Sequence, residues 1–189
     1  MAEITRARQV AKAMKEYGIE VLGISEARWK GKGFSVTLQS GEKVVYGRND
    51  EMQQGRVAIR MSKKAKGALT EWTLISKRIN TAGFYSKYKK LTVVQAYART
   101  TDAMDGKKDE FYNQLQQNVS SCNTNDMILM IGDLNAKVGN NNTNREEVMG
   151  KFGVSVMNDN GERLCDFCST NGLIITGAAF PHKDIHKLT

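Results

Sequence analysis

The stretch Met130-Ile131-Gly132-Asp133-Leu134-Asn135-Ala136-Lys137-Val138-Gly139 places an acid and an amide, two residues apart, at the end of an apolar run. The run Met127 to Ile131 is short and wholly apolar, which is typical of a strand buried on both faces. Side chains two residues apart on a strand point to the same face, so we expect Asp133 and Asn135 to converge on one metal-bound phosphate. A simpler alternative stays open, in which both side chains only satisfy backbone amides in a strand-to-loop turn.

Two further predicted strands end on a polar side chain. Val21 to Ser25 is a short apolar segment followed by Glu26, and Leu91 to Ala96 is followed by Tyr97. Proteins usually hold Mg²⁺ through one or two carboxylates together with phosphate and water. Glu26 and Asp133 are therefore the candidate carboxylates for Mg²⁺ or Mn²⁺. For Tyr97 the alternative stays open that it only covers an edge of the core.

The chain is basic, with a net charge of +8 at pH 7 from 28 Lys and Arg against 20 Asp and Glu. Excess positive charge favours a polyanionic partner without identifying it. Lysine clusters include Lys63 to Lys66 and Lys87 to Lys90, with Tyr85 and Tyr88 beside the second. We expect DNA contacts from Arg28, Lys63, Lys64, Lys66, Lys87, Lys89 and Lys90. A solvated hairpin tip is the commoner explanation of any single lysine cluster.

The sequence gives no sign of membrane insertion or secretion. No apolar run approaches the ~20 residues that span a bilayer, and the N-terminus lacks the apolar segment of a secretory signal. Three cysteines, an odd number, argue against a disulfide scaffold and fit a reducing compartment. We therefore expect a nuclear or cytoplasmic protein that is not secreted and has no membrane partner. Cys165 and Cys168 share a helical face and are predicted core residues, because no second cysteine pair completes a zinc site.

Helices and strands are mixed along the chain. Helices are predicted at Ala7 to Tyr17, after Asp105-Gly106 and at Glu162 to Thr170. Short strands are predicted between Val36 and Met61, and another at Leu173 to Thr176. With 189 residues and 40% apolar content, the chain suffices for one domain with a real core. Periodicity alone indicates an α+β class.

These segments, taken in order, resemble the exonuclease–endonuclease–phosphatase superfamily. They are most similar to the endonuclease domain of non-LTR retrotransposons, a group with craniofacial development protein 2-like sequences. The matching pieces are Leu22 to Trp29, Val57-Ala58-Ile59, Arg78-Ile79, Tyr97 to Thr100, Gly132 to Ala136, and Asn158 to Thr189. The resemblance covers nearly the whole chain and implies a partial four-layer α/β sandwich, with two packed mixed sheets and outer helices.

The resemblance also implies an activity, Mg²⁺-dependent hydrolysis of a DNA phosphodiester, and a role for each site residue. The Glu matching Glu26 binds the metal, and the Tyr matching Tyr97 supports the scissile phosphate. The residues matching Asp133 and Asn135 position the attacking water and the phosphate. Metal stabilisation and positioning are the larger contributions to such a reaction.

Two parts of the family pattern have no match in this sequence. Family members begin with a strand that carries a metal-site Asn, and they end with strands that bear an Asp and then an Asp-His pair. We therefore expect a single, incomplete domain over residues 1–189, inactive on its own. Two alternatives stay open: a non-catalytic nucleic-acid-binding or interaction remnant, and a phosphatase of the same superfamily. The oligomeric state is not predicted.

Overall fold

The computed structural model describes residues 2–27, 35–46 and 57–181, and it shows an α+β protein. The chain divides into two compact units. The first contains Met1–Tyr97 and Cys122–Gly132, and the second contains Ala98–Ser121 and Asp133–Thr189. The expectation of one domain over residues 1–189 stays a prediction. Within the described ranges no helix is long and apolar enough to cross a membrane.

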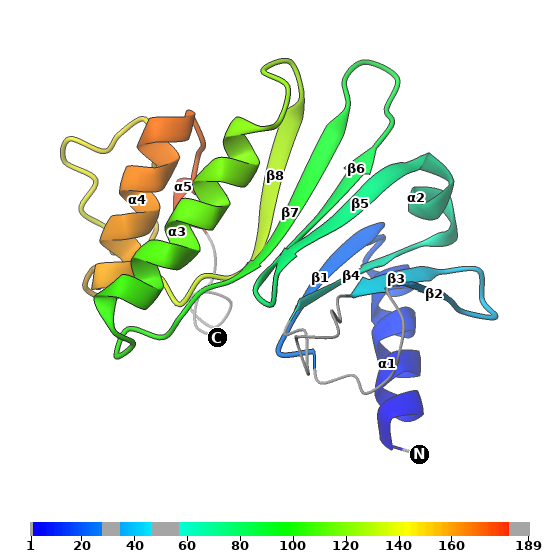
Figure 1. Ribbon diagram of the computed structural model, residues 1–189. Helices are drawn as coiled ribbons and strands as arrows, with labels where there is room; N and C mark the ends of the chain where they lie inside the picture. The colour runs from blue at the N-terminus through cyan, green and yellow to red at the C-terminus, as the bar shows by residue number, and fades with distance from the viewer. Residues whose placement is uncertain (1, 28–34, 47–56, 182–189) are drawn as a thin grey trace. The chain divides into compact units, whose positions relative to one another are not determined.

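The first unit contains a sheet of four strands in the order β1-β4-β3-β2 (Figure 1). These strands are β1 (Val21–Ser25), β2 (Ser35–Thr37), β3 (Lys43–Tyr46) and β4 (Val57–Met61). They confirm the predicted strand before Glu26 and the predicted strand region that ends at Met61. Every pairing is antiparallel, where a mixed sheet was expected. Val21 lies opposite Met61 and Ser25 opposite Val57, so Glu26 follows the end of β1 at which β4 begins.

The second sheet also has four strands, in the order β5-β6-β7-β8 (Figure 1). They are β5 (Leu69–Ser76), β6 (Ile79–Phe84), β7 (Leu91–Tyr97) and β8 (Met127–Asp133). β7 confirms the predicted strand and extends it by one residue, to Tyr97. β5 and β6 were not predicted from the sequence. β6 reads Ile-Asn-Thr-Ala-Gly-Phe, and its Asn and Gly are residues that strands usually avoid.

The predicted burial of β8 on both faces was wrong. Met127 is 59% exposed and Leu129 is 46% exposed, while Ile128, Met130 and Ile131 are partly buried. β8 is the last strand in the order of its sheet. An apolar run marks a strand but does not tell an edge position from a central one, because apolar atoms also make up much of a folded surface.

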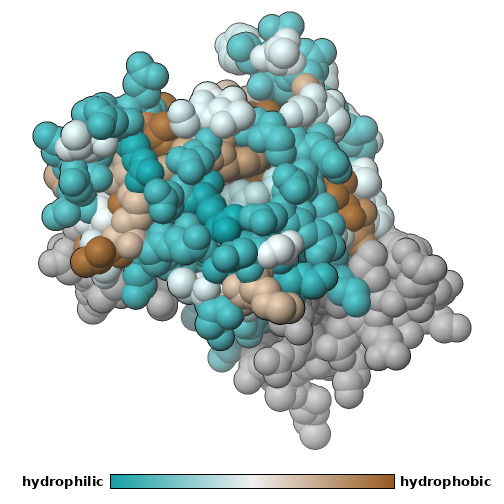
Figure 2. All heavy atoms as spheres, turned by 60° about the vertical axis from the view of Figure 1, so that its left-hand side comes forward, coloured by the Kyte–Doolittle hydropathy of each residue, from teal (hydrophilic) through white to brown (hydrophobic). Residues whose placement is uncertain are grey.

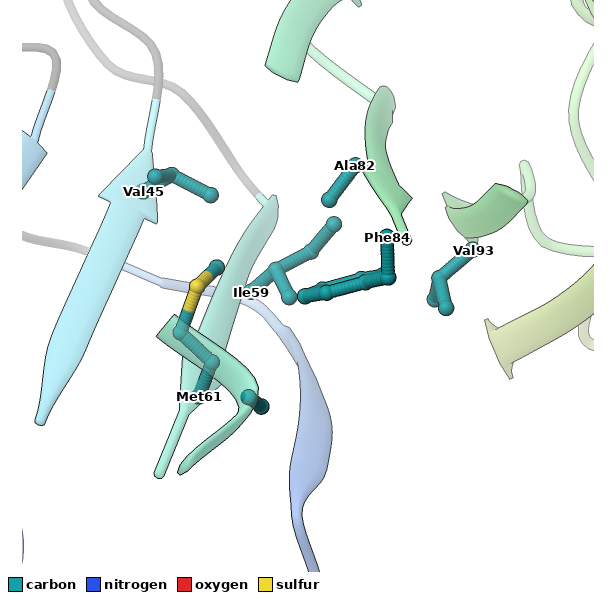
Figure 3. Close-up of a cluster of buried hydrophobic side chains, with 7 residues drawn as sticks. Val45, Ile59, Met61, Ala82, Phe84 and Val93 are labelled. Carbon is teal, nitrogen blue, oxygen red and sulfur yellow. The ribbon is translucent and has the colours of Figure 1, made fainter. Parts of the chain in front are cut away.

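The two sheets share a hydrophobic core. Figure 3 shows Ile59 from β4 beside Phe84 from β6, with Val45 and Met61 on one side and Val93 on the other. Ile59, Met61, Val45 and Val93 are fully buried. Full burial of one such side chain contributes about 1.5–3 kcal/mol. This face-to-face packing fixes the first sheet on the second within the first unit, and it confirms the predicted pair of packed sheets.

Two helices belong to the first unit, α1 (Ala2–Glu16) and α2 (Lys63–Ala68). α1 confirms the first predicted helix. Ser62 caps the N-terminus of α2, because its Oγ accepts the Ala65 N–H over 3.0 Å. The lysines of this segment therefore lie on a short helix, and the alternative of a hairpin tip was wrong for them. The Lys87–Lys90 segment does lie in the turn between β6 and β7.

The second unit is built on α3 (Asp105–Ser120) and α4 (Asp159–Asn171), both of which confirm predicted helices. The Tyr112 and Phe167 rings lie 6.1 Å apart between the two helices. α4 ends at Gly172, whose φ of 61° provides the left-handed cap. Cys165 and Cys168 are buried, as predicted. The face shown in Figure 2 is covered mainly by hydrophilic side chains.

The predicted strand at Leu173 to Thr176 was wrong. Only Ile175 makes a bridge, to Met149, and Thr176 begins the short helix α5 (Thr176–Ala179). β-branched residues cluster here and raise strand propensity, but the described segment has no second strand along which to form a ladder. Two packed sheets of four strands with helices nevertheless confirm the predicted sandwich class.

Candidate active site

Glu26 and Tyr97 are adjacent in the first unit. The Tyr97 Oη donates a hydrogen bond to Glu26 Oε1 over 2.8 Å. Glu26 directly follows β1 and is exposed, whereas Tyr97 ends β7 and is 6% exposed. The packing of the first sheet on the second brings these two strand ends together. Among the described residues the second carboxylate oxygen, Oε2, has no hydrogen-bond partner, which leaves it open to a cation or to water.

The backbone at Glu26 is held in the left-handed region, with φ of 56°. A residue with a Cβ rarely adopts this conformation, which costs on the order of 1–3 kcal/mol and persists only where its surroundings enforce it. Next to it, Gln95 Nε2 donates to Ser25 Oγ over 3.1 Å, and Ala27 is buried. A Cβ at Gly23 would lie 1.7 Å from Gln95 Oε1. The absence of a side chain at Gly23 therefore leaves room for Gln95 to reach β1. Its hydrogen bond to Ser25 there holds the residue that precedes Glu26.

Arg78 supports Tyr97 and was not predicted as a site residue. Its guanidinium carbon lies 4.7 Å from the centre of the Tyr97 ring, and its Nη1 donates to the Tyr97 carbonyl over 3.0 Å. The Tyr97 N–H donates to the Arg78 carbonyl over 2.8 Å. These contacts hold the phenol in place and put a positive charge over its ring. Arg78-Ile79 was one of the segments that matched the family in the sequence analysis, but only the pairing of β6 with β7 places Arg78 beside Tyr97.

Asp133 and Asn135 are adjacent in the second unit. The Asn135 N–H donates to Asp133 Oδ1 over 2.9 Å, and Asn135 Nδ2 donates to the Ala98 carbonyl over 3.1 Å. The Ala98 N–H donates to the Asp133 carbonyl over 2.9 Å. β8 ends at Asp133 and Asn135 has a left-handed φ of 50°, so the argument from a shared strand face was wrong. A side-chain-to-backbone turn joins them, as the simpler alternative described.

Asn158 and Asn160, which the sequence analysis did not predict, hold the Asn135 loop. Both donate through Nδ2 to the Asn135 carbonyl, over 3.1 and 3.2 Å. Asn160 Nδ2 also donates to the Arg99 carbonyl over 2.7 Å. The Asn158 Oδ1 accepts the Lys137 and Gly161 N–H groups and so caps α4. The N-terminus of α4 thereby fixes the strained backbone of Asn135. In the sequence, the only feature that could have pointed to these two residues is asparagine just before a predicted helix.

An ion-pair network joins α3 to α4 behind this loop. Lys108 Nζ lies 2.8 Å from Asp159 Oδ2 and 3.2 Å from Asp105 Oδ1, with its side chain 5% exposed. Arg163 pairs with Asp159 and Asp109. The hydrogen bond from Lys108 holds the pKa of Asp159 below its usual value, and Asp159 raises the pKa of Lys108 in return. The network fixes the helix that carries Asn158 and Asn160.

Both lysine clusters lie at the other end of the strands from Glu26 and Tyr97. Lys90 directly precedes β7 and Tyr97 ends it, a span of about 20 Å at about 3.3 Å per residue. α2 follows the end of β4 that pairs with Val21, the opposite end of β1 from Glu26. The expected DNA contacts from these lysines are therefore remote from the Glu26–Tyr97 pair. Arg28 lies outside the described residues.

The donor groups fit a hard divalent cation only in part. Glu26, Asp133 and Asn135 offer oxygen atoms, which Mg²⁺ and Mn²⁺ prefer. In the described part of the chain no group of three His, Cys, Asp or Glu residues gathers to hold a metal. Glu26 with its open Oε2 fits an arrangement in which one carboxylate binds the ion and phosphate and water complete its shell. That the two pairs share one phosphate stays a prediction.

Comparison with known proteins identifies sequences that are similar to this chain. No family model matches the sequence. The chain is 34% identical over 183 residues to craniofacial development protein 2 of Bos taurus, and 33% identical over 183 residues to that of Tragulus javanicus. The alignments cover 95% of this chain. The chain is therefore a homologue of one part of craniofacial development protein 2. It spans 30% of the length of the cattle protein and 31% of the other.

A solved structure supports the fold of this craniofacial development protein 2-like chain. The endonuclease domain of TRAS1, a telomere-specific non-LTR retrotransposon, matches with a TM-score of 0.55 at 13% identity. The match covers 86% of this chain and 63% of the TRAS1 chain. At this identity the likeness shows a shared fold. The predicted resemblance to craniofacial development protein 2-like sequences is thus confirmed by sequence, and the predicted resemblance to retrotransposon endonuclease domains is confirmed for the fold.

Proposed function

We propose that this chain supplies the metal-binding and phosphate-positioning residues of a Mg²⁺- or Mn²⁺-dependent DNA endonuclease. The observation that carries the proposal is the Tyr97–Glu26 hydrogen bond, because it joins an exposed carboxylate to a phenol at two strand ends of an endonuclease-type fold. A carboxylate with one oxygen held by the phenol keeps the other oriented toward a cation.

In this proposal the chain's own groups act on one phosphodiester. Glu26 holds the cation, which when bound neutralises phosphate charge and lowers the pKa of water. Asp133 orients the attacking water, and the second amide hydrogen of Asn135 donates to a non-bridging oxygen as negative charge develops on it. Tyr97 keeps its single O–H on Glu26 and so positions the carboxylate that holds the cation. Arg78 holds Tyr97, while Asn158 and Asn160 hold the Asn135 loop, so both side chains are positioned before the substrate arrives.

These four site residues are proposed to be insufficient alone. The family resemblance assigns an Asn and an Asp-His pair to the same reaction, and none of the described residues provides them. Catalytic groups that act as one unit are strongly non-additive. We therefore expect the 189-residue chain to nick DNA no faster than background.

The first test is metal binding by the chain itself. Titration with Mn²⁺, followed by the water proton relaxation rate, should show one site that Glu26→Gln weakens at least ~10-fold. Glu147→Gln, an exposed carboxylate change elsewhere, should leave it unchanged. If the Glu26→Gln variant and the unchanged chain bind Mn²⁺ equally, Glu26 does not hold the metal.

The second test is nicking of supercoiled plasmid by a chimaera in which a related full-length domain provides the segments that bear the family's Asn and Asp-His residues. Activity should need Mg²⁺ or Mn²⁺ and disappear in Asp133→Ala. Hydrolysis of a phosphomonoester without plasmid nicking would favour the phosphatase alternative instead. DNA binding without hydrolysis of either substrate would favour the non-catalytic remnant. Nicking by the 189-residue chain alone that Asp133→Ala abolishes would contradict the proposed insufficiency.

A further inference from the structure

One end of the first unit carries lysines and tyrosines on two joined segments, α2 and the turn between β6 and β7. The Tyr85 N–H donates to the Ala68 carbonyl over 2.7 Å, which links the end of α2 to the start of the turn. Leu69 and Phe84 pair directly beside this link. The two lysine clusters are therefore parts of one surface, which we call the lysine end. It consists of Lys63, Lys64, Lys66, Tyr85, Lys87, Tyr88, Lys89 and Lys90.

Four of the six lysines in this surface have no acidic partner in the part of the chain that the structure describes. Lys64 pairs with Glu20, and Lys90 pairs with Glu71. The others have no carboxylate within ion-pair distance among the described residues: Lys63, Lys66, Lys87 and Lys89. Three of these four side chains are exposed, and Lys66 is partly buried. Exposed, unpaired cations of this kind attract phosphates.

Both tyrosines of the lysine end face solvent on a structured turn. Tyr85 is 73% exposed and Tyr88 is 84% exposed. Ser86 Oγ accepts the Lys89 N–H over 3.3 Å and donates to the Lys89 carbonyl, which closes the turn. Lys87 Nζ lies 5.3 Å from the centre of the Tyr88 ring. The rings are thus exposed beside cations rather than buried in the core, and such rings can stack on nucleobases.

The surface is separate from the candidate active site. β7 alone places about 20 Å between the turn and Tyr97. A phosphate held by the lysine end is therefore several nucleotides away from one held beside Glu26. What the lysine end binds does not depend on whether the Glu26–Tyr97 pair takes part in hydrolysis.

We propose that the lysine end binds single-stranded nucleic acid, with its lysines on the phosphates and Tyr85 and Tyr88 stacked on bases. A duplex keeps its bases stacked inside, out of reach of an exposed ring, whereas a single strand presents them. Membrane binding usually requires inserted apolar side chains. Residues Lys63–Ala68 and Tyr85–Lys90 contain no Leu, Ile, Phe or Trp, so the surface fits a nucleic acid better than a lipid headgroup layer.

The test is fluorescence anisotropy of a labelled 20-nucleotide strand and its duplex, with the full chain, in EDTA so that no metal-dependent cleavage interferes. The single strand should bind at least ~5-fold tighter than the duplex. Tyr85→Ser with Tyr88→Ser should weaken single-strand binding ~10-fold or more, because stacking on two bases is lost. Lys87→Gln with Lys89→Gln should weaken it and reduce the salt slope by about 1.4, or about 0.7 per phosphate contact.

Matched controls lie in the second unit. Lys107→Gln with Lys151→Gln removes the same charge from exposed positions, and Phe180→Ser removes an exposed ring. Both should bind the strand like the unchanged chain. Circular dichroism of every variant checks folding, and photo-crosslinking of a 5-bromouridine strand should map to Tyr85 or Tyr88.

Several outcomes would overturn the proposal. One is equal binding of strand and duplex with no effect of the tyrosine changes, which would indicate a purely electrostatic duplex surface. Another is that the second-unit control variants lose as much affinity for the strand as the variants of the lysine end. Binding to vesicles that contain phosphatidylserine, without binding to the strand, would assign the lysine end to a membrane. None of these experiments measures hydrolysis. A negative result here therefore does not contradict the proposed nuclease function, and absence of nuclease activity would not contradict the proposed binding surface.

Discussion

Tyr97 Oη lies 2.8 Å from Glu26 Oε1, so one hydrogen bond joins the last residue of β7 to the residue that follows β1. The two residues are 71 positions apart in the sequence, and only the packing of one sheet on the other brings them together. A hydrogen bond to a charged group typically contributes about 1.5–3 kcal/mol. Because Glu26 is exposed and water replaces a lost donor, we expect a contribution just below that range, about 1 kcal/mol.

The Tyr97–Glu26 bond should appear as coupling in a double-mutant cycle. Tyr97→Phe and Glu26→Gln should each lower the free energy of unfolding by about 1 kcal/mol, and the double variant should lose less than the sum. Urea denaturation at pH 7 measures all four proteins. Strictly additive losses would contradict the bond. Tyr17→Phe, at a position that is 79% exposed just after α1, serves as a comparison for removing a tyrosine hydroxyl.

Gly23 should be irreplaceable, because a Cβ there would meet Gln95 Oε1 at 1.7 Å. Gly23→Ala must displace Gln95 and with it the hydrogen bond to Ser25, so we expect a loss of about 1–3 kcal/mol. Gly67→Ala is the matched control, since nothing lies within 4 Å of its added Cβ. In helix α2 that change should stabilise by up to about 1 kcal/mol. Chemical denaturation compares the two, and equal effects would refute the close contact.

The sequence predicted the elements that its local pattern encodes. β1, β7, α3 and α4 follow from apolar periodicity and from glycine or asparagine at their ends. β6 was missed because Asn80 and Gly83 lower its strand propensity, although both are buried in the sheet. The burial of β8 was wrong because an apolar run does not reveal which strand lies at the edge of a sheet.

The candidate site was predictable only in its chemistry. Strand-end positions and the family resemblance selected Glu26, Tyr97, Asp133 and Asn135. Arg78 and Asn160 were missed, because their contacts depend on strand pairing and on the docking of α4 against a loop far away in sequence. Nor did the sequence predict that Asn135 lies beyond β8 in a left-handed conformation.

The Lys108–Asp159 ion pair should make stability fall in acid. Lys108 lowers the pKa of Asp159, so the pair stabilises the fold above the ordinary carboxyl pKa of about 3.9 and loses that effect as pH falls through the lowered value. Asp159→Asn should therefore cost stability at pH 7 and little at pH 2. Because the Asp159 side chain is 41% exposed, we expect at most about 1 kcal/mol. Thermal unfolding across pH 2–7 measures the difference, with Glu147→Gln as control. A difference that stays constant with pH would contradict the pair.

The cysteines of α4 should resist alkylation in the folded protein. Burial raises the pKa of Cys165 and raises that of Cys168 to about 12, so neither thiol forms appreciable thiolate at pH 8. Iodoacetamide should modify both only at the rate of local unfolding, and urea should make them reactive. Cys122, partly buried with a pKa also raised by burial, provides an internal comparison. Rapid labelling of Cys168 in the native protein would refute its burial.

Asn160 should matter more for stability than its neighbour Asn158. Asn160 is 1% exposed, and its amide donates to the Arg99 and Asn135 carbonyls. Asn160→Ala leaves the Arg99 carbonyl without that donor, so we expect a loss of about 1–3 kcal/mol. Asn158→Ala removes the cap of α4, which typically costs about 1 kcal/mol. Asn158→Asp retains the capping oxygen and should restore most of that loss, whereas Asn160→Asp replaces the donor with an acceptor and should restore none. Urea denaturation of these variants decides the point. Rescue by aspartate at position 160 would show that its amide does not hold the Asn135 loop.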